Sequence, residues 1–96
     1  MKIEKIINTL PFDGLKTNKL VSNETGSMIL VSIEKGKELT AHKSKTDAAV
    51  LILEGEVIFK INGEAHTLKV HDMFSFKKEE EHAVEAVSNA KFIVVK

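Results

Sequence analysis

The stretch GKELTAHKSKTDAAVLILEGE, residues 36–56, decides how this chain folds. It starts at a glycine turn, passes a single histidine, His42, and continues into an apolar run at residues 48–53 that stops at Glu54 and Gly55. A short apolar run bounded by turn residues is typical of a strand that is buried on both faces. We therefore expect the interior of a β-barrel on one side of this run and a second covering element on the other.

Short strands and turn residues alternate along most of the chain. The dipeptide Asn62-Gly63 favours positive φ at both central positions of a tight turn, and it predicts a β-hairpin. The runs between turns are rich in Val, Ile and Phe, and strands at this spacing predict a sandwich or a small barrel. The N-terminal segment KIEKIINTLPF, residues 2–12, leaves a short helix and an added strand open. The fold class predicted is all-β.

The amino-acid composition indicates which kinds of binding partner this chain can have. The chain has 96 residues, enough for one domain, and its 43% hydrophobic residues are typical of a globular protein. Its 14 basic residues are all lysines and balance 14 acidic ones, so the formal net charge is zero. A neutral chain without Arg, Trp or Tyr lacks the groups that bind and stack on nucleic acids, so we expect no nucleic-acid partner. Without cysteine there is no disulfide and no thiolate nucleophile.

The sequence also argues against a membrane or a secretory route. The longest apolar run, residues 48–53, is too short to cross a bilayer. Glu4 and Lys5 interrupt the segment that would have to form the apolar part of a signal peptide. We therefore expect a cytoplasmic protein with no membrane partner.

Glycines and histidines recur at a spacing that points to one family. Five residues separate Gly36 from His42, and Gly55 follows at the end of the apolar run. Further along, Gly63 stands in a hairpin and His82 follows an Asp turn by about ten residues. These two groups are similar to the two motifs of the cupin superfamily, at about residues 36–55 and 63–86. The resemblance implies a cupin-like jelly-roll β-barrel that occupies residues 1–96 as a single domain.

In cupins of this kind, three histidines and one glutamate commonly hold a divalent transition metal inside the barrel. Matched position by position, His42 corresponds to the first histidine and His82 to the last. Ser44 stands in place of the second histidine, and Ala48 in place of the glutamate. The resemblance thus implies a degenerate metal site. Either His42 and His82 hold Fe, Mn, Ni or Zn, or the site no longer binds a metal.

Ser44 and Ala48, which stand in place of a histidine and a glutamate, are expected to weaken metal binding. Side chains alternate along a strand, so residues 42 and 44 share a face and Ser44 should point inward. A neutral hydroxyl is a poor ligand beside imidazole, and two imidazoles fall short of the three protein ligands usual at catalytic zinc. Asp47 is one residue out of register and should face outward. The sequence leaves open whether Asp47, His66 or His71 compensates; we expect His66 on a half-exposed strand and His71 at a surface turn.

Three functions remain open. The first is binding of a small molecule in an apolar pocket with a few polar anchors, which is the usual composition of such sites. The residues expected to line this pocket are His42, Ser44, Val50, Ile52, Phe59, Phe74, His82 and Val84. The second is a metal-dependent enzyme of the dioxygenase, isomerase or decarboxylase type that uses His42 and His82. The third is a dimeric interaction or regulatory module, since the doubly apolar run could pack against a second copy in a homodimer.

Overall fold

The structure, a computed structural model, describes residues 5–96. These residues form one short helix and a series of antiparallel strands. The elements are α1 (Ile6–Thr9), β1 (Leu15–Asn23), β2 (Gly26–Ile33), β3 (Glu38–Lys43), β4 (Ala48–Glu54), β5 (Val57–Ile61), β6 (Glu64–Leu68), β7 (Met73–Phe76), β8 (Glu81–Ala86) and β9 (Ala90–Val95).

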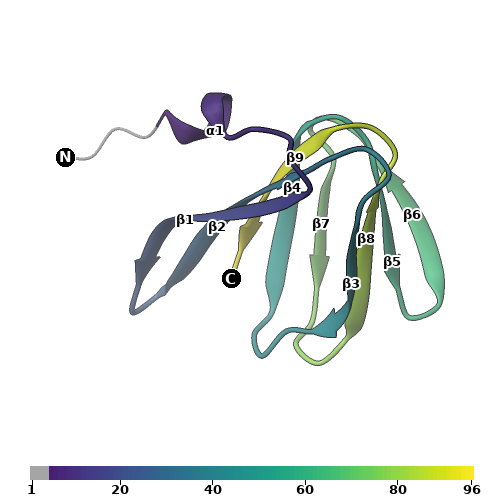
Figure 1. Ribbon diagram of the computed structural model, residues 1–96. Coiled ribbons are helices and arrows are strands. Elements are labelled where there is room, and N and C mark those ends of the chain that lie inside the picture. The colour runs from purple at the N-terminus through teal and green to yellow at the C-terminus, as the bar shows by residue number, and fades with distance from the viewer. Residues whose placement is uncertain (1–4) are drawn as a thin grey trace.

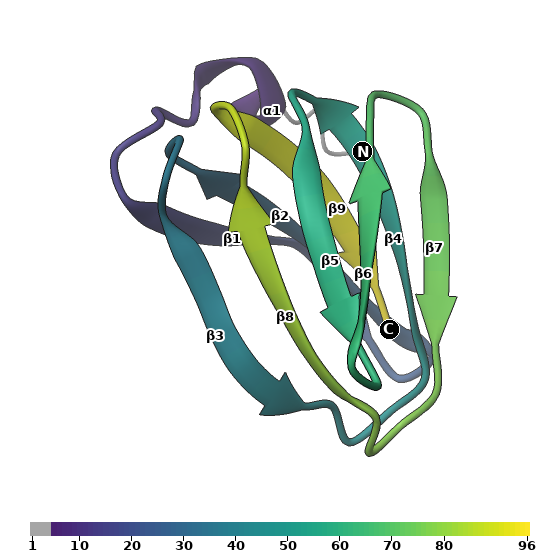
Figure 2. The ribbon, with the colours of Figure 1, turned by 90° about the vertical axis from the view of Figure 1, so that its right-hand side faces the viewer.

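The strands form two sheets that face each other across the core. The larger sheet has the order β1-β2-β9-β4-β7, and the smaller sheet has the order β3-β8-β5-β6. Figure 1 shows the β1–β2 hairpin extending away from the rest of the molecule, and Figure 2 shows the smaller sheet in front of the larger one. Because the chain crosses repeatedly between the sheets, residues far apart in sequence meet inside. The all-β jelly-roll prediction is confirmed.

The Asn62-Gly63 turn joins β5 to β6 as predicted. Asn62 has φ 52° and Gly63 has φ 78°, the positive values that a tight hairpin turn of this kind requires. The strands that it connects pair in register from Val57 with Leu68 to Ile61 with Glu64.

One end of the space between the sheets is completely filled. Side chains at alternate positions of neighbouring strands meet there because successive residues of a strand point to opposite faces. Each of them is at most 3% exposed: Ile33, Ile52, Val57, Ala86 and Ala90. Ile33 pairs with Ala90 in the larger sheet, and Val57 pairs with Ala86 in the smaller one. The opposite end of the barrel is built differently and is described below.

The N-terminal segment covers part of the outer face of the larger sheet. Ile6, Ile7 and Leu10 pack there against a second apolar cluster centred on Leu30 and Ile93, to which Leu53 of β4 also belongs. This explains in part why β4 is apolar on both faces. Of the two options for the N-terminal segment, the structure shows the short helix.

Strand β1 was not anticipated from the sequence. Its residues are mostly exposed and alternate only weakly between apolar and polar, because β1 pairs with β2 alone at the edge of the sheet. Within residues 5–96, no helix is both long enough and apolar enough to cross a lipid bilayer.

Candidate functional site

A cavity of about 660 Å³ occupies the end of the barrel opposite the filled layer. Its walls come from both sheets and are largely apolar. The apolar residues that line it are Ile29, Val31, Leu39, Ala48, Val50, Phe59, Phe76, Val84, Phe92 and Val94. Its rim is polar and comes from the β1–β2 turn, the β3–β4 loop and Lys96. The cavity therefore combines an apolar interior with a polar opening.

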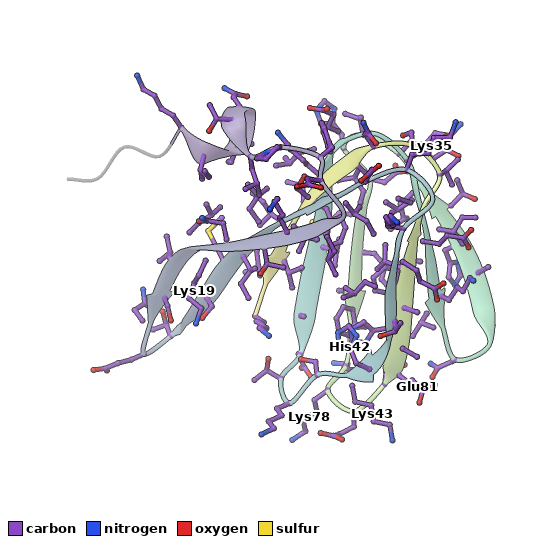
Figure 3. The ribbon with its side chains drawn as sticks, viewed as in Figure 1. Lys19, Lys35, His42, Lys43, Lys78 and Glu81 are labelled. Carbon is purple, nitrogen blue, oxygen red and sulfur yellow. The ribbon has the colours of Figure 1, made fainter. Side chains whose placement is uncertain are left out.

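His42 and His82 face each other at this end of the barrel. They are direct partners in the antiparallel β3–β8 ladder, and their ring centroids lie 4.2 Å apart at an interplanar angle of 63°. His82 is only 5% exposed, whereas His42 is exposed on an edge strand. Figure 3 shows His42 directed into the lower end of the barrel, while Lys43 and Glu81 point away at the rim. The two motif histidines thus form one pair.

Both imidazoles are held in the same tautomer. His42 Nδ1 lies 2.9 Å from the Thr40 carbonyl oxygen, and His82 Nδ1 lies 2.9 Å from the Glu80 carbonyl oxygen. A carbonyl oxygen can only accept, so each Nδ1 carries the proton and donates it. In the neutral ring Nε2 is then an acceptor, and no other residue in 5–96 is hydrogen-bonded to either Nε2. The pair offers two unused lone pairs.

Aromatic rings surround His82. It stacks almost parallel to Phe59, at 7° and 5.7 Å between centroids, and the Phe76 ring lies 4.1 Å away. Burial lowers the pKa of His82 below 6.5, the ordinary value, and the neighbouring His42 acts in the same direction. The hydrogen bond to the Glu80 carbonyl opposes this shift. His82 is therefore held as a neutral ring in an apolar setting.

Most of the residues predicted to bind a ligand line the cavity. They are His42, Ser44, Val50, Phe59, His82 and Val84. Ile52 does not line it; its side chain is fully buried, although its ladder partner Phe92 does line the cavity. Phe74 does not either, because it packs between Phe59 and His66, with centroids 5.0 and 5.5 Å away. Ligand binding by the lining residues stays a prediction.

Phe76 and the β1–β2 turn are parts of the site that sequence reasoning missed. Phe76 lies opposite Ala48 across the β4–β7 ladder and reaches His82. The small side chain at residue 48, where the resemblance places a glutamate, is compatible with this approach. The signal for Phe76 was its period-two spacing from Phe74. For the turn at residues 23–27, no local signal could have shown that it reaches the cavity.

The donors present do not fit a tightly held catalytic metal. Ser44 Oγ accepts a hydrogen bond from the Thr46 amide at 3.3 Å, and Ala48 has no donor atom. Asp47 accepts from the Lys78 amide at 2.9 Å. In the described part of the chain, no three His, Cys, Asp or Glu side chains gather as a metal site would require. Two imidazole nitrogens alone fall short of the usual set.

The remaining histidines lie elsewhere. His66 Nε2 is 3.3 Å from Glu64 Oε2 on β6, and its side chain is 38% exposed. His71 has φ 74° in the turn before β7, where Asp72 accepts a hydrogen bond from the Lys69 amide. Neither lines the cavity.

Comparison with known proteins identifies the family. The model of the Cupin domain family matches residues 29–96, which include both histidines and most of the strands. The chain belongs to the cupin domain family. No curated protein matches this cupin significantly.

Solved structures agree with this fold. An RmlC-like cupin protein from Desulfovibrio desulfuricans superimposes with a TM-score of 0.89 at 21% identity, covering 99% of this chain and 94% of the other. A conserved protein of unknown function from Streptococcus pyogenes gives a TM-score of 0.79 at 26% identity, with 86% and 73% covered. A predicted oxalate decarboxylase from Thermotoga maritima gives 0.75 at 24% identity, with 84% and 77% covered. One of these proteins is of unknown function and another is a predicted oxalate decarboxylase, so this likeness shows the fold alone.

Proposed function

We propose that this cupin binds a small organic molecule in the barrel cavity, with His42 and His82 as its polar anchors. One observation carries the proposal: the two imidazoles face each other at an apolar cavity, and neither Nε2 has a hydrogen-bond partner within residues 5–96. A few polar groups on an apolar wall are the arrangement that fixes the orientation of a small ligand.

The size of the cavity supports this function. Its volume of about 660 Å³ lies within the range of roughly 300–1,000 Å³ that is usual for small-molecule sites. Val50, Val84 and Phe92 supply apolar wall from three strands, so an aliphatic or aromatic body would lose water-exposed surface on entering. The filled layer behind Val50 limits how deep that body could go.

The protonation of the pair selects the ligand's polar group. Because both Nδ1 atoms donate to backbone carbonyls, each Nε2 is an acceptor when its ring is neutral. The ligand should therefore present a donor, such as a hydroxyl or an N–H, to the histidines. A metal-dependent reaction receives less support, since the described residues supply only two nitrogens for a metal.

The test uses a neutral probe. Nile red, a neutral dye whose fluorescence rises in apolar surroundings, should bind the protein, and octanol should displace it. We expect His42→Ala to weaken octanol binding about fivefold, the loss expected for one hydrogen bond of about 1 kcal/mol. His42 is exposed on the edge strand β3, so its removal should leave the core intact.

His66→Ala is the matched control. It removes a histidine of the same barrel that does not line the cavity, and it should leave octanol binding unchanged. Absence of any dye binding or octanol displacement would overturn the proposal. Equal affinities in the wild type, His42→Ala and His66→Ala would overturn the anchoring role of the histidine pair.

A further inference from the structure

The rim of the cavity carries an excess of positive charge. Lys43, Lys45 and Lys96 line it, and among the described lining residues Glu24 is the one with an acidic side chain. The whole chain, by contrast, has a net charge of zero. Apart from Glu24, no acidic side chain of residues 5–96 lines the cavity, although Glu81 lies at the rim as the ladder partner of Lys43.

The three lysines reach the rim from different parts of the sequence. Lys43 ends β3, Lys45 lies in the loop before β4, and Lys96 follows β9. Lys96 is fixed to the β1–β2 hairpin, because its amide donates to the Ser27 carbonyl at 2.9 Å and its carbonyl accepts from the Ser27 amide. The fold thus brings together charges that are separated by more than half of the chain.

None of these ammonium groups is neutralised within residues 5–96. Elsewhere on the surface, Lys60 lies 3.3 Å from Glu85 and Lys77 lies 4.0 Å from Asp47. Lys43 has Glu81 as its partner in the β3–β8 ladder, but their charged groups do not come within 4.0 Å. Lysines clustered around an opening create a local positive potential for an entering ligand.

The rim and the histidine pair belong to one electrostatic environment. The positive charge of Lys96 is among the influences that lower the pKa of His82, after burial and His42. At the same time, the two Nε2 lone pairs would repel an anionic group placed against them. A ligand charge is therefore favoured at the rim and disfavoured at the histidines.

We propose that the ligand of this site is a small organic anion, whose charged group lies among Lys43, Lys45 and Lys96 and whose apolar body enters the barrel. This inference rests on the proposed function and adds the ligand's charge and its orientation. A hydroxyl or N–H at the far end of the molecule would meet the histidine pair. The class is that of a carboxylate with an aliphatic or aromatic body and a distal donor.

The experiment compares octanoate with octanol as competitors of Nile red. The two probes share a chain length and differ in charge. We expect octanoate to bind about tenfold more tightly than octanol at low salt, as three partly screened ion pairs would give. The advantage should shrink at high salt, because these lysines are exposed.

Two triple variants distinguish an effect of the rim lysines from an effect of the protein's net charge. The triple variant Lys43→Gln/Lys45→Gln/Lys96→Gln should abolish the advantage of octanoate over octanol. The control variant Lys19→Gln/Lys35→Gln/Lys37→Gln removes the same charge from exposed lysines that do not line the cavity, and it should keep the advantage.

The outcomes distinguish the two proposals. Octanol binding with no preference for octanoate would overturn the anion inference and leave the proposed function standing. An octanoate preference that both triple variants reduce equally would also overturn it, since net charge would then be the cause. Failure of both probes to displace the dye would instead remove the proposed function.

Discussion

The backbone carbonyl of Asn89 occupies the space that a Cβ on Gly55 would need. Gly55 has φ 78° in the turn between β4 and β5, so two constraints act on one residue. Gly63 in the β5–β6 turn also has φ 78°, but a Cβ there would meet nothing within 4 Å. The two glycines thus share a backbone conformation and differ only in the close approach.

Because of this difference, we expect Gly→Ala to lower the free energy of unfolding by different amounts at the two positions. Gly63→Ala should lower the free energy of unfolding by about 1 kcal/mol, the strain of a left-handed residue with a side chain. Gly55→Ala should cost at least about 3 kcal/mol, because the β8–β9 turn must also move. Urea unfolding of both variants measures this, and equal costs would contradict the assigned role of Asn89.

His82 predicts a pH dependence of stability. Its pKa is lowered in the folded state by burial. Below about pH 6.5, His82 is therefore protonated in the unfolded chain but still neutral in the folded protein. The free energy of unfolding consequently falls as pH falls toward the folded pKa. Above about pH 6.5 both states hold a neutral ring and this contribution to the pH dependence vanishes.

Replacement of His82 by Phe should remove this contribution. Urea unfolding at about pH 7.5 and about pH 5.5 should show a smaller loss of stability for His82→Phe than for the wild type. His66→Ala, which removes a half-buried histidine of β6 that lies outside the cavity, is the control variant. An unchanged pH dependence in His82→Phe would rule out burial of this ring as its source.

We predict that Lys91 holds the N-terminal segment against the larger sheet. The residue is 4% exposed, its Nζ donates to the Ile7 carbonyl oxygen at 2.7 Å, and it lies 4.9 Å from the Phe12 ring centroid. Lys91→Met keeps the apolar stem but removes the donor, and it should cost about 1–3 kcal/mol. Amide hydrogen exchange should accelerate in residues 5–12 more than in the barrel.

Lys60→Met is the control for that experiment. Lys60 pairs with Glu85 at 3.3 Å on the surface, where an ion pair is worth about 0–1 kcal/mol. Its replacement should leave exchange in residues 5–12 unchanged. If Lys91→Met also left it unchanged, the contact with Ile7 would not be what holds the segment.

Elemental analysis tests the metal alternative. We expect protein purified without an affinity tag to retain less than one equivalent of Fe, Mn, Ni or Zn, because two imidazoles alone bind these ions weakly. The double variant His42→Ala/His82→Ala, measured in parallel, identifies metal bound by the pair. Near-stoichiometric metal that disappears in the double variant would contradict this expectation and restore the enzyme hypothesis.

The homodimer expected from the doubly apolar β4 also stays a prediction. The N-terminal segment covers Leu53, but Met73 beside Leu51 is 69% exposed and Val95 is 46% exposed on the same sheet. Sedimentation should show a dimer in the wild type and a shift toward monomer in Met73→Glu, which places a charge in this apolar surface. A wild-type monomer at micromolar concentration would contradict the prediction.

The sequence by itself determined the fold class and the pair of motif histidines. Local chemistry was enough for this: Asn62-Gly63 specifies a hairpin through its φ values, and alternation places Val50 and Val84 inside. The replacements at residues 44 and 48 could likewise be judged from ligand chemistry alone.

The tertiary structure decided where the barrel is hollow and what surrounds the pair. Ile52 and Val50 look alike in sequence, yet only Val50 lines the cavity, whereas Ile52 is fully buried two residues further along β4. Phe76 reaches His82, and Lys96 joins Lys43 at the rim, through strand pairings between distant segments. Such placements depend on register and depth within the whole barrel, which local sequence patterns do not encode.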